Sequence, residues 1–172
     1  MITAQPRVVL VGPPGAGKTT VGRRLSTALA VSFRDTDHDI ESAAGKPISE
    51  IFFDDGEEEF RRLEVAAVQA ALSEHDGVLA LGGGAVLSPI TRDRLRSHTV
   101  VYLAVGMAAA ASRVGLARDR PVLALNPRAM LHKLLSERDP LYAEVATVRV
   151  ETDDKSLDEV TAEVLASIGA RL

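Results

Sequence analysis

Residues 12–19 read Gly-Pro-Pro-Gly-Ala-Gly-Lys-Thr and match the phosphate-binding pattern GxxxxGK[ST] at every fixed position. The aliphatic run 7–11 before this loop predicts a buried strand, and the four-residue spacing of Val21, Leu25 and Leu29 predicts a helix over 18–30. A strand, a glycine-rich loop and a helix in this order direct backbone N–H groups and a helix N-terminus at a phosphate. The alternative is a glycine-rich turn that binds nothing, and the complete match in this context disfavours it.

The side chains of this loop have separate expected roles. We expect Lys18 to bridge the β- and γ-phosphates of a bound nucleotide and the hydroxyl of Thr19 to supply one ligand to a single Mg²⁺ ion. The residues predicted to bind the nucleotide here are Gly15, Ala16, Gly17, Lys18, Thr19 and Thr20. A loop of this kind occurs in kinases, GTPases and motor ATPases, so other residues must decide between these classes.

The rest of the chain alternates between aliphatic runs and amphipathic segments. Further strands are predicted at 31–34, 78–81, 100–105 and 147–151. Helices are predicted from the acidic residues after 34 to Ala44, then over 47–53, 57–74, 126–145 and 156–168, with a weak one at 108–114 and an irregular loop at 115–125. Gly45 should end the second helix, Gly56 should break the third, and Pro140 should kink or end the 126–145 helix. At the helix starts, Asn126 is the predicted cap of the 126–145 helix, and Ser156 with Glu159 should form a capping box for the last helix. Together these elements predict an α/β fold, a three-layer sandwich around a five-stranded parallel sheet, with ligands at the carboxyl ends of the strands.

Composition excludes several functional classes. A chain of 172 residues with 46% hydrophobic and 26% charged residues fits one globular domain spanning 1–172. A net charge of -4, 3% aromatic residues and no Trp argue against nucleic acid or an anionic membrane as a partner. The absence of cysteine excludes disulfides and thiolate chemistry. No apolar run is long enough to span a membrane and the N-terminus does not resemble a secretion signal, so we expect a cytoplasmic protein.

Acidic residues follow the second predicted strand. Asp35 and Asp37 are two residues apart, so both side chains should point to the same side, close to the nucleotide if the first two strands are neighbours. One carboxylate could serve the metal ion and proton transfer, and the other could accept hydrogen bonds from substrate hydroxyls. Alternatively, both acids cap the helix that starts near His38. Asp39 is assigned to this capping role.

Two further groups have open interpretations. Arg61 and Arg62 are adjacent on a predicted helix, so at most one of them readily faces a site, and either could be a solvated surface side chain. The triplet Gly82, Gly83 and Gly84 allows close approach to the backbone, but a tight turn after a strand explains it equally well. No metal-ligand spacing is found among His38, His75, His98 and His132, and they are expected to be surface or packing residues.

Ordered blocks along the chain are similar to the shikimate kinase family, well beyond the phosphate-binding loop. The blocks are Asp35-Thr36-Asp37 with Ile40-Glu41, then 48–52, Gly56-Glu57 running into Glu59-Phe60-Arg61, Gly82-Gly83-Gly84-Ala85, Arg120-Pro121, and Arg138 followed by Pro140-Leu141-Tyr142. The resemblance covers almost the whole chain. It implies a nucleoside-monophosphate-kinase-like P-loop kinase with a helical substrate-binding segment at about 34–64 and a lid at about 113–125.

The resemblance also implies an activity and the residues that carry it. The implied reaction transfers the γ-phosphate of ATP to the 3-hydroxyl of shikimate, with Mg²⁺, and the enzyme is expected to be a monomer. By resemblance, Asp37 holds the ring hydroxyls of the acceptor, Arg61 and Arg138 clamp its carboxylate, and the backbone of the glycine triplet, Gly83 above all, contacts it. The resemblance also implies that Asp35 lies by the metal and the reacting hydroxyl. On the nucleotide, Arg120 reaches the phosphates, and Arg113 and Lys155 border the adenine. The implied catalytic residues are therefore Lys18, Asp35 and Arg120. An arginine fork pairs with a carboxylate through two hydrogen bonds, which suits this acceptor.

Two other functions compete with this interpretation. A kinase for another small hydroxy acid such as gluconate would share the phosphate-binding loop and the lid but differ in the acceptor pocket. A non-catalytic nucleotide-binding module would share only the loop. Arg61, Arg138 and the glycine triplet favour shikimate over the first competitor.

Overall fold

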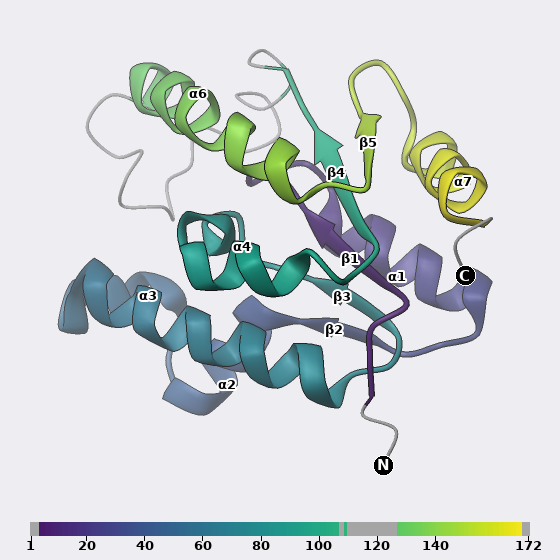
Figure 1. The fold of residues 1–172 in the computed structure, drawn as a ribbon. Coiled ribbons are helices and arrows are strands. Elements are labelled where there is room, and N and C mark those ends of the chain that lie inside the picture. Colours follow the sequence, from purple (N-terminus) through teal and green to yellow (C-terminus); the bar gives the residue numbers. More distant parts are fainter. Residues whose placement is uncertain (1–3, 107–108, 110–126, 170–172) are drawn as a thin grey trace.

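The computed structural model describes residues 4–106, 109 and 127–169, and a five-stranded parallel sheet lies at its centre (Figure 1). The strands are β1 (Val8–Val11), β2 (Phe33–Asp35), β3 (Val78–Ala80), β4 (Val100–Ala104) and β5 (Val148–Glu151). Their order across the sheet is β2-β3-β1-β4-β5, and every neighbouring pair is parallel. The predicted sheet is confirmed.

Helices cover both faces of this sheet and give three layers. They are α1 (Lys18–Leu29), α2 (Thr36–Ala44), α3 (Ile48–Glu74), the short 3₁₀ turn η1 (Ala85–Leu87), α4 (Pro89–Leu95), α6 (Pro127–Val145) and α7 (Leu157–Ile168). One apolar core lies between the sheet and α1 with α7, and the other lies between the sheet and α3, α4 and α6. The three-layer architecture predicted from the sequence is therefore confirmed.

The central strand shows why these strands are continuously aliphatic. Val8 and Leu10 face the core under α1 and α7, whereas Val9 and Val11 face the opposite core, and all four are 0–1% exposed. A parallel strand covered on both faces has no solvent side on which a polar residue would be favourable. The strand β1 therefore lacks the alternation of apolar and polar residues that marks a half-exposed strand.

Glycine residues end or break helices where the sequence predicts. Gly45 caps the C-terminus of α2 in the left-handed conformation, with φ 72°. Gly56 interrupts α3 with φ 87° and ψ 166°, values outside the helical region. The break separates the first turns of α3, which pack beside α2, from its long second part. The capping box predicted at Ser156 and Glu159 is also present at the start of α7.

The sequence analysis missed one helix. The sequence pattern predicts no element at 88–99, but α4 occupies Pro89–Leu95. Its start carries recognisable signals, because Ser88 caps it by accepting a hydrogen bond from the N–H of Thr91 and Pro89 holds the first helical position. The helix has only seven residues, which is too short to display an apolar period.

The helix α6 does not end at Pro140, since residues through Val145 remain helical. Its predicted cap Asn126, the 115–125 loop and nearly all of the predicted helix at 108–114 lie outside the described residues. Within the described part of the chain, no helix is long and apolar enough to cross a membrane.

Parallel strands end at a common edge, and the residues expected to be functional follow these ends. The phosphate-binding loop follows β1, Asp35 is the last residue of β2, and the glycine triplet begins two residues after β3. The strand β2 begins two residues later than predicted, which brings Asp35 into the sheet. Ligand sites of parallel α/β sheets lie at this edge.

Candidate active site

The phosphate-binding loop depends on glycine at positions where other residues are strained. Gly15 and Gly17 have φ of 82° and 91°, and Gly12 has φ 153°. A Cβ on Gly12 would also lie 2.5 Å from the carbonyl oxygen of Leu103 in β4. The loop can therefore curl tightly against the sheet edge and lead directly into α1 at Lys18.

Lys18 and Thr19 lie at the mouth of this loop. The Lys18 ammonium donates hydrogen bonds to the carbonyl oxygens of Gly12, at 2.7 Å, and Pro13, at 3.0 Å. These contacts hold the charged end of the Lys18 side chain against the backbone of its own loop. Thr19 Oγ1 donates to Asp35 Oδ2 over 3.2 Å, which joins the loop to the end of β2.

Asp35 caps α2 and also contacts the phosphate-binding loop. Its Oδ1 accepts a hydrogen bond of 2.9 Å from the N–H of Asp37 and caps α2, while its Oδ2 faces Thr19. No cluster of three or more acidic or histidine metal ligands occurs among the described residues. Thr19 and Asp35 provide two adjacent oxygens, which fits Mg²⁺, because this ion usually takes one or two protein oxygens and completes its shell with phosphates and water. The predicted metal residues thus lie together.

The capping role assigned to Asp39 is wrong. Asp39 lies inside the first turn of α2, and its Oδ2 accepts a hydrogen bond of 2.6 Å from Arg34 Nε. Arg34 also donates to Glu74 at the end of α3, over 3.1 Å. Asp39 is therefore tied to β2 and α3, and Asp35 is the cap because it directly precedes the helix.

A cavity of about 420 Å³ opens beside the phosphate-binding loop. Five of the predicted acceptor residues line it, namely Asp37, Arg61, Gly83, Gly84 and Arg138. The other lining residues are Pro14, Glu41, Pro47, Ile48, Ser49, Phe52, Phe60, Glu64 and Leu134. The cavity reaches the loop through Pro14, whereas Lys18 and Asp35 are not among the described residues that line it. The structure thus gathers residues from α2, α3, α6 and the glycine triplet around one space.

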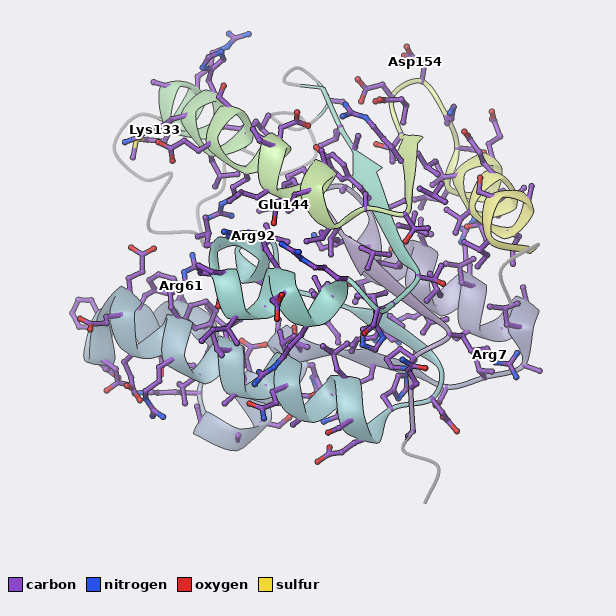
Figure 2. The ribbon with its side chains drawn as sticks, viewed as in Figure 1. Arg7, Arg61, Arg92, Lys133, Glu144 and Asp154 are labelled. Carbon is purple, nitrogen blue, oxygen red and sulfur yellow. The ribbon has the colours of Figure 1, made fainter. Side chains whose placement is uncertain are left out.

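Arg61 of α3 lines this cavity, and Figure 2 shows it on the side of α3 nearest α4. Its Nη1 lies 2.9 Å from Glu64 Oε1, and its guanidinium carbon lies 5.2 Å from the centre of the Phe60 ring. Arg62, the next residue, is two-thirds exposed and pairs with Glu59. The expectation that only one of these two arginines faces the site is therefore confirmed.

The glycine triplet is required by close contacts and not by backbone conformation. A Cβ on Gly82 would lie 2.3 Å from Asp37 Oδ1, one on Gly83 would lie 3.0 Å from Pro14 Cδ, and one on Gly84 would lie 2.2 Å from Arg61 Nη1. Each glycine thus makes room for a different wall of the site. The interpretation as a turn alone does not explain these three contacts.

Comparisons with known proteins agree with this geometry. The family model described as "Shikimate kinase" matches residues 14–169. The chain belongs to the shikimate kinase family. It is 58% identical over 165 residues to a shikimate kinase of Salinispora arenicola, covering 96% of this chain and 99% of the relative. The activity class expected from the resemblance, an ATP-dependent phosphotransferase, is confirmed.

Solved structures of the shikimate kinase family have the same fold. One from Acinetobacter baumannii in complex with shikimate has a TM-score of 0.92 at 38% identity, covering 98% of this chain and 95% of that one. A gluconokinase from Sinorhizobium meliloti has a TM-score of 0.63 at 20% identity, covering 99% and 95% of the two chains. The gluconokinase likeness shows the shared fold alone.

Glu64 is a lining residue that the sequence analysis missed. This glutamate of α3 is 3% exposed, and burial raises the pKa of its carboxyl, whereas the charge and hydrogen bond of Arg61 lower that pKa. Asp37 raises it further and Arg138 lowers it. The Glu64 carboxyl is therefore influenced by charges of both signs among the residues that line the cavity. Its sequence signal was its place three residues after Arg61, on the same side of the helix.

Tyr142 is the second residue that was missed, although it lies in one of the shikimate kinase blocks. Its side chain is 1% exposed, and its hydroxyl donates a hydrogen bond of 2.5 Å to the carbonyl oxygen of Gly83. Burial raises the pKa of Tyr142 to about 12, with Arg138 acting in the opposite direction through its charge and a hydrogen bond. Tyr142 thereby connects α6 to the glycine triplet.

The remaining predicted residues lie elsewhere or outside the described residues. The Lys155 ammonium lies 2.6 Å from Glu163 Oε2 of α7, and its contact with adenine stays a prediction. Arg113 and Arg120 lie outside the described residues. His75 is buried, with Nε2 3.0 Å from the carbonyl oxygen of Val78, which agrees with the expected packing role.

Proposed function

We propose that this protein transfers the γ-phosphate of ATP to the 3-hydroxyl of shikimate, giving shikimate 3-phosphate and ADP. The observation that carries the proposal is the cavity in which Arg61 and Arg138 meet Asp37 beside Pro14 of the phosphate-binding loop. Shikimate has one carboxylate and three hydroxyls on a six-membered ring. The proposal is also supported by the relative solved in complex with shikimate.

Each end of the acceptor has a matching group in this proposal. Arg61 and Arg138 bind the carboxylate, since a guanidinium offers two parallel donors to its oxygens. Asp37 accepts hydrogen bonds from ring hydroxyls, and the backbone of Gly82, Gly83 and Gly84 lies against the ring. The apolar lining provided by Ile48, Phe52, Phe60 and Leu134 suits the carbon skeleton of the ring.

On the donor side, the N–H groups of residues 15–20 hold the phosphates, and the Lys18 ammonium turns from the carbonyls of its own loop to the β- and γ-phosphates. Asp35 accepts the proton of the 3-hydroxyl of shikimate. The oxygen of that hydroxyl forms a bond to the γ-phosphorus, and the bond between this phosphorus and the bridging oxygen of the β-phosphate breaks. Thr19 and Asp35 would hold one Mg²⁺. Mg²⁺ neutralises charge on the phosphates when bound. Arg120 stabilises the charge of the transferred group.

The proposal extends to the organisation of the protein. We propose a single domain over 1–172, with a substrate-binding segment at about 34–64 and a lid at about 113–125 that excludes water during transfer. Arg113 and Lys155 would border the adenine. The protein would work as a cytoplasmic monomer.

A coupled assay of ADP release tests this function. Shikimate, quinate, gluconate and a nucleoside monophosphate are supplied separately with Mg²⁺ and ATP, and kcat/KM is compared. We expect shikimate to be preferred by at least about 100-fold, because an acceptor that lacks a matching group leaves buried charges unpaired. Preference for any other acceptor refutes the assignment, and an absence of turnover with all four favours a nucleotide-binding module.

A further inference from the structure

The helix α6 carries Arg138, so its position sets where one of the two acceptor arginines lies. Among the described residues, several side-chain contacts connect α6 to the sheet side of the molecule, including one of 3.5 Å between Arg149 of β5 and Asp139. Three others are short hydrogen bonds. Tyr102 of β4 donates a hydrogen bond of 2.6 Å to Asp139, Tyr142 donates one of 2.5 Å to Gly83, and Arg92 of α4 donates one of 2.9 Å to Glu144. The first two involve residues next to or within the site. The third lies outside it.

Arg92 makes more contacts than a simple ion pair. Its Nε donates to Glu144 Oε2, and its Nη1 donates to the carbonyl oxygens of Val86, at 2.8 Å, and Leu87, at 3.2 Å. These two carbonyls end the 3₁₀ turn η1, which directly follows the glycine triplet. Figure 2 shows Arg92 and Glu144 together between α4 and α6. One planar guanidinium thus joins three chain segments, a geometry that an ammonium cannot reproduce.

The consequence concerns the spacing of the two acceptor arginines. The segment 83–87 is fastened to α6 at both ends, by Tyr142 at Gly83 and by Arg92 with Glu144 at Val86 and Leu87. The same segment also limits Arg61, because the guanidinium lies directly against Gly84. A shift of the segment relative to α6 would therefore move the surface against which the Arg61 guanidinium lies relative to Arg138.

We propose that Arg92 and Glu144 are a positioning pair that sets the separation of Arg61 and Arg138 for binding the acceptor carboxylate. This role rests on the proposed function of the cavity. Neither residue lines the cavity, and the Arg92 and Glu144 side chains are 19% and 47% exposed. The Glu144 side chain is about half exposed, so removing its carboxylate should cost little global stability. Its loss therefore acts on acceptor binding more than on folding.

The test compares Glu144→Ala, Glu144→Gln, Arg92→Lys and the double variant Arg92→Lys/Glu144→Ala. Initial rates give the KM for shikimate and for ATP, and thermal unfolding gives the Tm. We expect the shikimate KM to rise about 3- to 10-fold in Glu144→Ala and in Arg92→Lys, and less in Glu144→Gln, which keeps an acceptor for Nε. The ATP KM should stay within about twofold. The double variant should be no worse than the worse single variant, since the two residues act as one pair.

Glu59→Ala is the matched control, because it removes a surface pair with Arg62 and neither of these residues lines the cavity. It should leave both KM values unchanged. Additive effects in the double variant, an unchanged shikimate KM, or equal rises in both KM values together with a lower Tm would each overturn the proposal. If the wild-type protein does not phosphorylate shikimate, the proposed function fails instead, so the two failures are distinguishable.

Discussion

Replacing Gly84 by alanine places a single methyl group against the Arg61 guanidinium. The added Cβ would lie 2.2 Å from Nη1, 2.7 Å from Cζ and 2.8 Å from Nη2. Ordinary van der Waals contact needs about 3.5 Å, so the guanidinium must move by more than about 1 Å. Gly84 has φ -98° and ψ 3°, values that alanine adopts, so the backbone itself does not oppose the change.

The displaced group is the end of a flexible side chain, so the fold accommodates the methyl group and the effect falls on the site. Arg61 is held between Glu64 and Phe60, and a shift away from Gly84 removes it from its present place on the cavity wall. A misplacement of about 1 Å in a positioning group can cost up to about 100-fold. We expect the shikimate KM to rise about 10- to 100-fold and the ATP KM to change by less than about twofold.

The coupled ADP-release assay, with each substrate varied in turn, measures both constants. Gly169→Ala is the control, since a Cβ there meets nothing within 4 Å and its φ is -54°. An unchanged shikimate KM in Gly84→Ala would refute the placement of Arg61 at the acceptor. Equal rises in both constants would indicate general damage to the site.

Three further variants test other parts of the account. Arg138→Lys should raise the shikimate KM by about 10-fold or more and leave the ATP KM nearly unchanged, because the fork to the carboxylate is lost; parallel changes in both constants, measured by initial rates, would argue against it. Lys18→Met should lower kcat by at least about 100-fold while calorimetry still detects shikimate binding, and a kcat near the wild-type value would exclude the phosphate-bridging role. The pKa of Tyr142 in the folded protein is raised to about 12, above its value in the unfolded chain. The buried neutral hydroxyl therefore stabilises the folded protein fully below the unfolded pKa, and this stabilisation is lost as the pH rises through the folded pKa. Urea unfolding should therefore show the wild type losing about 1 kcal/mol relative to Tyr142→Phe between about pH 9 and pH 11, and a constant difference would contradict the buried hydroxyl.

The phosphate-binding loop and the sheet could be predicted because their signals are local. Eight consecutive residues define the loop, and an aliphatic run marks each strand through its burial on both faces. Gly45 and Gly56 likewise acted through their own backbone conformation. Such features depend little on which distant segments pack nearby.

The walls of the acceptor cavity were harder to predict because they depend on tertiary contacts. Helix geometry alone allowed at most one of Arg61 and Arg62 to face a site, and the resemblance named Arg61; the fold places Arg61, and not Arg62, in the cavity wall. Glu64 was missed because glutamate on a helix is usually solvated, and only burial beside Arg61 distinguishes it. Tyr142 was missed for a related reason, since its partner is a backbone carbonyl 59 residues away.

The central claim is that Arg61 and Arg138 bind the carboxylate of the acceptor while Asp37 holds its hydroxyls. A crystal structure of the protein with shikimate and ADP tests it most directly. The account predicts both guanidiniums within about 3 Å of the carboxylate oxygens and the 3-hydroxyl directed toward the phosphate-binding loop. Shikimate bound outside this cavity, or with its carboxylate away from both arginines, would contradict the account.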